Sequence, residues 1–131
     1  MKLLLPFHVQ KVGAGFPSPA TDYVEDDIDL NVHLIKNVPA TFVIRVQGKS
    51  MTDVGVNDGD ILVVDKSLNP KNFSTVIANV HDELVVKSFV KEGNKKFLTS
   101  GSKKFEDRIL INEEEDIFIW GVVTYVIHSV Y

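Results

Sequence analysis

The stretch that decides the fold is residues 75–99, TVIANVHDELVVKSFVKEGNKKFLT. It holds three apolar-rich runs separated by two short polar turns. The runs are Thr75–Val80, Glu83–Lys91 and Lys96–Thr99, and the turns are His81-Asp82 and Glu92-Gly93-Asn94. Short runs rich in Val, Leu and Phe between such turns are typical of antiparallel strands. The stretch therefore predicts three consecutive strands.

The same pattern extends on both sides of this stretch. Further strands are predicted at Thr41–Gln47, Ile61–Val64, Arg108–Ile111 and Asp116–Tyr131. In the first of them, Phe42, Ile44 and Val46 alternate with the residues of the other face. Many short strands with such punctuation predict a mainly β domain built of small antiparallel sheets.

Length and composition limit the classes of protein to which the chain can belong. The chain has 131 residues, of which 44% are hydrophobic and 24% charged, and this fits one globular domain and excludes a wholly disordered chain. It has no cysteine, which excludes disulfides, a thiol nucleophile and Cys-ligated metals. The net charge of −4 disfavours a protein that wraps nucleic acid. Pro6 ends the leading apolar run before it reaches the length of a signal peptide, so we expect a cytoplasmic protein.

The N-terminal region differs from the rest. Residues 1–21 hold three of the five prolines and no acidic residue, which predicts a flexible, extended arm ahead of a domain at 22–131. After it, residues 22–36 carry five acids, and Asp29 is placed to cap a short helix over Leu30–Lys36 that buries Leu30, Leu34 and Ile35. The acidic cluster could bind metal or form a solvated surface. We favour the surface, because the ligand spacing of a calcium loop is absent.

Two segments carry candidate chemistry. Gly48-Lys49-Ser50-Met51 follows the Thr41–Gln47 strand, and a glycine there permits a sharp turn that exposes a serine hydroxyl beside free backbone N–H groups. Lys87 shares a strand face with Val85 and Phe89. Apolar surroundings disfavour the charged form of a lysine, and a neutral amine can act as a general base. Each segment alone also fits a plain turn or a lysine that reaches out to water.

Taken together, the motifs resemble the LexA/UmuD family of self-cleaving Ser-Lys peptidases, peptidase family S24. The matching runs are Gly48-Lys49-Ser50-Met51, Asp58-Gly59-Asp60-Ile61-Leu62-Val63-Val64-Asp65, Val85-Val86-Lys87 and Gly121-Val122-Val123. Upstream, Gly15-Phe16-Pro17-Ser18-Pro19-Ala20 and the acidic run after it are similar to the UmuD members. The resemblance extends from about Val12 to the C-terminus and implies a LexA-like, signal-peptidase-like catalytic domain.

The resemblance also implies roles for individual residues. Ser50 would be the nucleophile, Lys87 the general base, and the backbone N–H groups of Ser50 and Met51 the candidate oxyanion donors. The bond to be cut would be Ala14-Gly15 in the protein's own arm, although some UmuD proteins have cysteine where this chain has Ala14. No histidine, metal or cofactor is expected to take part.

The function implied is that of an SOS-response accessory factor. Self-cleavage stimulated by the RecA filament on single-stranded DNA would yield a trimmed homodimer that associates with a Y-family translesion polymerase similar to UmuC. No helix-turn-helix fits residues 1–21, so direct sequence-specific DNA binding is not expected. The arm could reach its own active site or that of a dimer partner.

Three other interpretations stay open. The chain could be a non-catalytic β-domain for dimerisation and polymerase binding, since fold alone does not separate the two functions. A type I signal peptidase would share the Ser-Lys chemistry but needs a membrane anchor, and no membrane association is expected. The six lysines of Lys87–Lys104 could form a partner-binding face or a solvated hairpin, and we favour the hairpin.

Overall fold

The computed structural model describes residues 4–8, 24–101 and 108–131. The chain divides into two compact units, residues 1–36 and 37–131. In the first unit, strand β1 (Leu4–His8) pairs antiparallel with β2 (Val24–Asp29), with Leu5 opposite Ile28, and helix α1 (Leu30–Leu34) follows.

The second unit contains an antiparallel sheet of seven strands among the described residues, in the order β3-β4-β9-β5-β6-β7-β8. The strands are β3 (Thr41–Arg45), β4 (Ile61–Asp65), β5 (Thr75–Val80), β6 (Glu83–Glu92), β7 (Lys95–Thr99), β8 (Ile109–Leu110) and β9 (Ile117–Ile127). Short 3-10 helices η1 (Val38–Ala40), η2 (Thr52–Val54) and η4 (Glu113–Glu115) lie between them. All seven strands fall where the sequence predicts them, which confirms the mainly β, antiparallel fold class.

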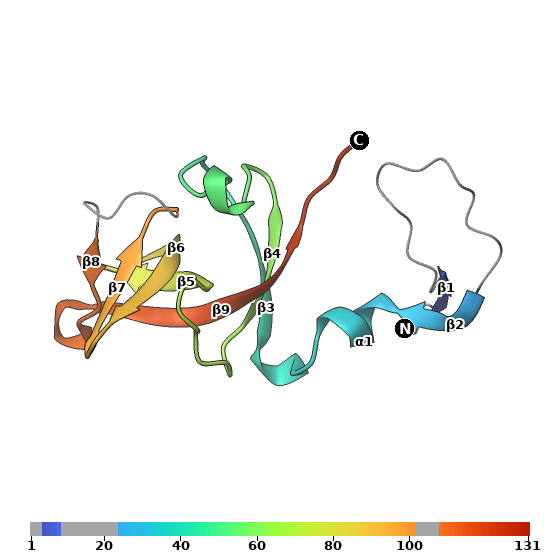
Figure 1. The fold of residues 1–131 in the computed structure, drawn as a ribbon, viewed down its shortest axis with the longest axis horizontal. Helices are drawn as coiled ribbons and strands as arrows, with labels where there is room; N and C mark the ends of the chain where they lie inside the picture. The colour runs from blue at the N-terminus through green and yellow to red at the C-terminus, as the bar shows by residue number, and fades with distance from the viewer. Residues whose placement is uncertain (1–3, 9–23, 102–107) are drawn as a thin grey trace. The chain divides into compact units, whose positions relative to one another are not determined.

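Strand β9 holds the sheet together because it pairs with β4 on one side and β5 on the other (Figure 1). Its register shifts against β5 between Ile77 and Ala78, and against β4 between Val63 and Val64. Such bulges bend a strand and increase its twist, and β9 is accordingly a long curved strand in Figure 1. One strand thereby contributes to two separate cores.

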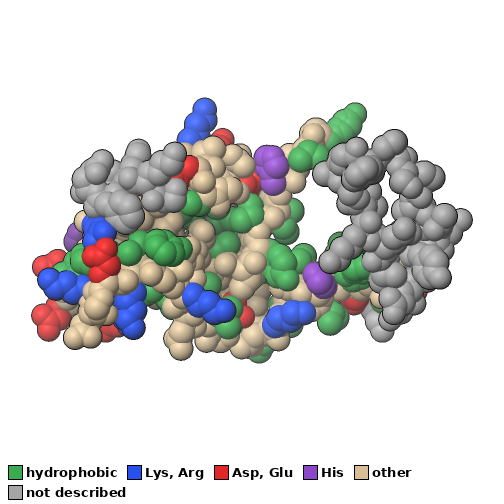
Figure 2. All heavy atoms as spheres, viewed as in Figure 1, with side chains coloured by type: hydrophobic (Ala, Val, Ile, Leu, Met, Phe, Trp, Pro, Cys, Tyr) green, Lys and Arg blue, Asp and Glu red, His purple; other side chains and the backbone are tan. Residues whose placement is uncertain are grey.

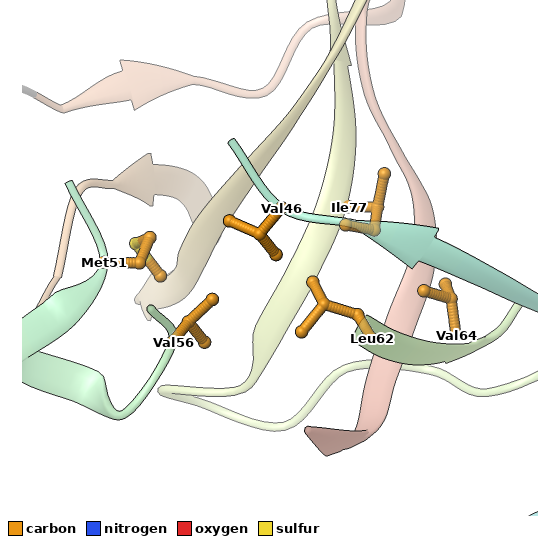
Figure 3. Packing of buried hydrophobic residues seen from close by; sticks show 6 residues of the cluster. All are labelled: Val46, Met51, Val56, Leu62, Val64 and Ile77. Atoms are coloured by element: carbon orange, nitrogen blue, oxygen red, sulfur yellow. The ribbon is translucent and has the colours of Figure 1, made fainter. Parts of the chain in front are cut away.

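The two cores use opposite faces of β5 and β9, since the neighbours Val76 and Ile77 belong to different cores. The first consists of Val46, Met51, Val56, Leu62, Val64 and Ile77, and Figure 3 shows Met51 and Val56 side by side at one end of it. The second consists of Val76, Ala78, Phe89, Leu98, Ile117 and Val122. The predicted apolar face of β3 is largely confirmed, since Val46 is buried and Ile44 packs on the first core, while Phe42 packs on the ring of Trp120.

In the N-terminal unit, the predicted helix cap is present but the predicted burial of the helix is only partly observed. Asp29 caps α1 as predicted, accepting a hydrogen bond from the Asn31 N–H at 3.0 Å. The predicted burial of Leu30 is wrong, since this side chain is 46% exposed, while Leu34 and Ile35 are half-buried. A helix of five residues makes little more than one turn and therefore buries little surface.

Strands β1 and β2 were not among the predicted strands. The run that forms β2, VEDDID, is dominated by acids, which are rare in strands, so only its pairing with β1 identifies it. Strand β1 lies within the segment 1–21 for which an arm is predicted. The proposed cleavage bond, Ala14-Gly15, lies outside the described residues, and the division at residues 21 and 22 stays a prediction.

Candidate active site

Ser50 lies in the connection between β3 and β4, and the base of this loop is fixed by backbone hydrogen bonds. The Val46 N–H donates to the Asp60 carbonyl and the Gly59 N–H donates to the Val46 carbonyl, both at 2.8 Å. One turn further out, the Gly48 N–H donates to Oδ1 of Asp58 at 2.7 Å. Gly48 has a φ of 109°, which agrees with the sharp turn that the sequence indicates. The loop that carries Ser50 therefore leaves the sheet in a defined direction.

The loop is also held from inside the molecule. Met51 is 2% exposed and Val56 is 1% exposed, and both belong to the first core. The carbonyl of Met51 accepts hydrogen bonds from the N–H groups of Val54 and Val56, at 3.1 and 3.2 Å. Ser50, by contrast, is exposed. Burial of the next residue thus holds the serine at the surface without covering its hydroxyl.

The candidate oxyanion donors are available in this loop. Within the described part of the chain, no hydrogen bond uses the backbone N–H of Ser50 or Met51. Backbone N–H groups left open in a fixed loop are the donors that stabilise a developing oxyanion in acyl transfer. The loop therefore offers a nucleophile and two donors within two consecutive residues.

Lys87 comes from strand β6, where it lies opposite Val76 of β5. The lysine is half-buried, with half-buried Val85 and fully buried Phe89 on the same strand face. Its Nζ donates a hydrogen bond to Oγ of Ser100 at 2.8 Å. The amine is thus held at a defined position rather than extending freely into water.

The two predicted catalytic residues line one groove. Its volume is about 400 Å³, and Ser50 and Lys87 are both among its lining residues. The remaining walls come from the end of β3 and the loop after it, from the first half of β6, and from the first core; the lining residues are Ile44, Arg45, Val46, Gln47, Gly48, Met51, Ile77, Leu84, Val85 and Val86. The structure therefore brings together the two segments that the sequence singled out.

Both strands that border the groove have an edge without a partner among the described residues. Strand β3 is the first strand of its sheet, and β7 pairs with β6 only from Ser88 to Glu92. The half of β6 that precedes Ser88 thus has an open edge beside the groove. Open strand edges accept extended peptides through backbone hydrogen bonds, so the groove suits a peptide substrate.

A short turn after β7 contacts both halves of the site. Ser100 accepts the hydrogen bond from Lys87, and the N–H of Gly101 donates to Sδ of Met51 at 3.1 Å. The Thr99 hydroxyl donates to the Gly101 carbonyl at 3.1 Å within the same turn. The sequence pattern alone gives Ser100 no role in the site. The missed signal is the hairpin register, because Ser88 pairs with Thr99 and the next position places Ser100 across from Lys87.

A buried carboxylate lies at the base of the Ser50 loop. Asp60 is 2% exposed, its Oδ2 accepts the Asn57 N–H at 2.8 Å, and its Oδ1 lies 2.6 Å from Nδ1 of His128. The Asn57 N–H, together with the His128 ring, holds the pKa of Asp60 below its usual value against the opposing effect of burial. Asp60 therefore caps the turn that begins at Asn57. The sequence pattern gives no sign of the contact with His128.

The lysine-rich region forms the β6–β7 hairpin. Lys91, Lys95 and Lys96 are exposed on it, whereas Lys103 and Lys104 lie outside the described residues. Arg108 forms a bidentate pair with Glu92 at 2.7 and 2.8 Å, which lowers the pKa of Glu92 and raises that of Arg108. On the face shown in Figure 2, basic and acidic side chains lie side by side at this end of the molecule. This mixture of charges supports the solvated hairpin.

Among the described residues, no group of three or more His, Asp or Glu side chains could hold a metal ion. No helix in residues 4–8, 24–101 and 108–131 is long and apolar enough to cross a membrane.

Comparison with known proteins gives a consistent result. The family described as Peptidase S24-like matches residues 6–124. Protein MucA of Salmonella typhimurium is 38% identical over 121 residues, which cover 92% of this chain and 82% of MucA. Protein ImpA of Escherichia coli is 43% identical over 123 residues, which cover 94% of this chain and 83% of ImpA. The LexA repressor of Providencia rettgeri is 34% identical over 121 residues, 92% of this chain and 58% of the repressor.

Proposed function

The chain belongs to the Peptidase S24-like family of serine peptidases, and from this premise we propose that it is a self-cleaving peptidase in which Ser50 is the nucleophile and Lys87 the general base. The observation that carries the proposal is the groove that both residues line. One residue comes from the β3–β4 loop and the other from β6, so only the folded chain brings them together.

The proposed reaction is an acyl transfer in two steps. The neutral amine of Lys87 takes the proton of the Ser50 hydroxyl as Oγ attacks the carbonyl carbon of the substrate. The carbonyl oxygen becomes an oxyanion that the N–H groups of Ser50 and Met51 stabilise. The ammonium of Lys87 then gives its proton to the departing amine, and the peptide bond breaks. Water, deprotonated by the same lysine, hydrolyses the acyl ester and restores Ser50.

The proposed substrate is the protein's own Ala14-Gly15 bond. Small residues on both sides of the bond allow its carbonyl to approach the Ser50 loop closely. The open edges of β3 and β6 can hold an extended segment by backbone hydrogen bonds. Cleavage would leave residues 15–131 as the product, whether the arm comes from the same chain or from a dimer partner.

The role proposed for the product follows the similarity to MucA and ImpA over most of their length. We expect a cytoplasmic homodimer whose self-cleavage is stimulated by the RecA filament on single-stranded DNA. The trimmed dimer would be an accessory subunit of a UmuC-like, error-prone Y-family polymerase. In a part of the molecules the arm would already lie in the groove without the filament. The filament would then need only to bind this conformation more tightly and so raise its fraction.

The test is incubation of the purified full chain at alkaline pH, where a lysine amine loses its proton (about pH 10 for an unperturbed lysine). Mass spectrometry should show a product that lacks residues 1–14. Ser50→Ala and Lys87→Ala should each stop its formation, with unchanged thermal unfolding. Lys49→Ala is the matched control, because it removes an exposed lysine beside Ser50 and should still be cleaved.

The outcomes separate the two candidate functions. A wild-type chain that stays full length, both at alkaline pH and with RecA filaments, would favour the non-catalytic β-domain for dimerisation and polymerase binding. Cleavage at Ala14-Gly15 that persists in both Ser50→Ala and Lys87→Ala would leave the peptidase activity but remove this pair from it.

A further inference from the structure

The hydroxyl of Ser100 contacts the Lys87 amine, and nothing in the proposed reaction uses it. The Nζ–Oγ distance is 2.8 Å. We propose that Ser100 is a positioning residue that orients the Lys87 amine toward Ser50. This inference rests on the proposed function and adds a third side chain to the site.

The position of Ser100 is a consequence of the hairpin. Strands β6 and β7 pair antiparallel from Glu92 opposite Lys95 to Ser88 opposite Thr99. The next cross-strand position brings Ser100 opposite Lys87. Side chains that face each other across a strand pair are close enough to interact. The register of the hairpin therefore brings Ser100, one residue beyond the end of β7, beside Lys87.

The turn that carries Ser100 is itself fixed against the Ser50 loop. Gly101 donates its N–H to Met51, the buried residue directly after Ser50, and accepts a hydrogen bond from Thr99. Gly101 has a φ of 73°, a conformation that favours glycine. Consecutive residues of one turn thus contact the base on one side and the nucleophile loop on the other, so the turn sets their relative position.

The contact has a clear chemical use. A neutral lysine amine has two N–H bonds and one lone pair, and only the lone pair can take the proton of Ser50. Donation of one N–H to Ser100 fixes the rotation of the amine and leaves the lone pair free. It also restricts a long flexible side chain before the substrate arrives, which reduces the entropy lost in reaching the reactive geometry.

Ser100 is not a second candidate nucleophile. Ser50 lines the groove, whereas Ser100 is not among the residues that line it. Ser100 is half-buried and Ser50 is exposed. Ser100 can thus act on the reaction only through Lys87.

The test compares self-cleavage rates of the full chain from neutral to alkaline pH. Ser100→Ala should lower the rate at the alkaline plateau about 10- to 100-fold, as expected for a misplaced catalytic group. Ser100→Thr keeps the hydroxyl and should restore the plateau rate. Ser67→Ala removes a hydroxyl bonded to Asp65 and should match wild type.

Each alternative result has a defined meaning. A lower plateau rate in Ser100→Ala that Ser100→Thr does not restore would assign Ser100 a purely structural role and overturn the inference. A rate that is unchanged or higher in Ser100→Ala would overturn it as well. A wild-type chain that stays uncut would contradict the proposed function itself, whereas a cut wild type with an equally fast Ser100→Ala contradicts only this inference.

Discussion

Ser50 and Met51 are neighbours in the chain with opposite environments. The serine is exposed in a groove, while the methionine is 2% exposed and packs in the first core. Burying an apolar side chain of this size stabilises the fold by about 1.5–3 kcal/mol. That burial restrains the backbone on the C-terminal side of Ser50, so the nucleophile gains a fixed position from its neighbour rather than from its own contacts.

Gly101 is a residue at which a substitution should disturb this geometry. Its φ of 73° strains any other residue by about 1–2 kcal/mol, and an added methyl group would overlap the Asp53 carboxylate. Gly101→Ala should therefore be destabilised in urea unfolding and should cleave itself more slowly.

Gly93 provides the matched control for this substitution. It has a φ of 59°, with nothing within 4 Å of an added Cβ. Gly93→Ala should lose stability in urea unfolding through backbone strain alone, and it should cleave itself at the wild-type rate. Equal cleavage by the two variants would mean that the turn after β7 does not set the site geometry.

The Asp60 carboxylate predicts a loss of stability in acid. Its pKa is lowered in the folded state, so the unfolded chain binds a proton more readily. The stabilisation is complete above the unfolded-state value of about 3.9 and decreases as the pH falls through the lower folded-state value. Urea unfolding between pH 6 and pH 2 should show this decrease in wild type. In Asp60→Asn the decrease should be smaller, and an identical pH dependence in the two proteins would contradict the assignment.

At the scale of elements, β9 depends on a close approach at Gly121. This buried residue lies opposite Ile77, and a Cβ added to it would lie 2.5 Å from Cγ1 of Val64. Gly121→Ala should overpack this site and cost about 1–3 kcal/mol in the free energy of unfolding. The combination of Gly121→Ala with Val64→Ala should recover part of that loss. A double variant no more stable than expected from adding the two single effects would show that the two residues do not compete for space.

The strands of the second unit could be predicted from sequence because each is an apolar run between recognisable turns. Thr75–Val80 begins and ends where the structure has β5. Strand β2 could not be found this way, since its acidic run is held by pairing with β1 rather than by its own propensity. Leu30 was predicted to be buried because apolar residues usually are, but the short α1 has little surface to bury.

The candidate site also contains residues that the sequence identifies and residues that only the structure reveals. Ser50 and Lys87 stood out because a glycine turn and an apolar strand face leave local signals, and the family resemblance connected them. Ser100 and His128 left no such signal. Their contacts with Lys87 and Asp60 depend on strand register and on where β9 ends, which are properties of the assembled sheet.

At the scale of the whole molecule, the groove exists only because distant parts of the second unit meet. The β3–β4 loop supplies Ser50 and the open half of β6 supplies Lys87, while the turn after β7 contacts both segments through Ser100 and Gly101. The Ser50–Lys87 pair is therefore a property of residues 37–131.

The most direct test of the central claim is the distance between Oγ of Ser50 and Nζ of Lys87 in a crystal structure of the wild-type protein at alkaline pH. We predict that the two atoms lie within hydrogen-bonding reach, about 2.6–3.2 Å, or are joined by one water. A structure in which other side chains separate the hydroxyl from the amine, so that neither a direct hydrogen bond nor one water can connect them, would contradict the account.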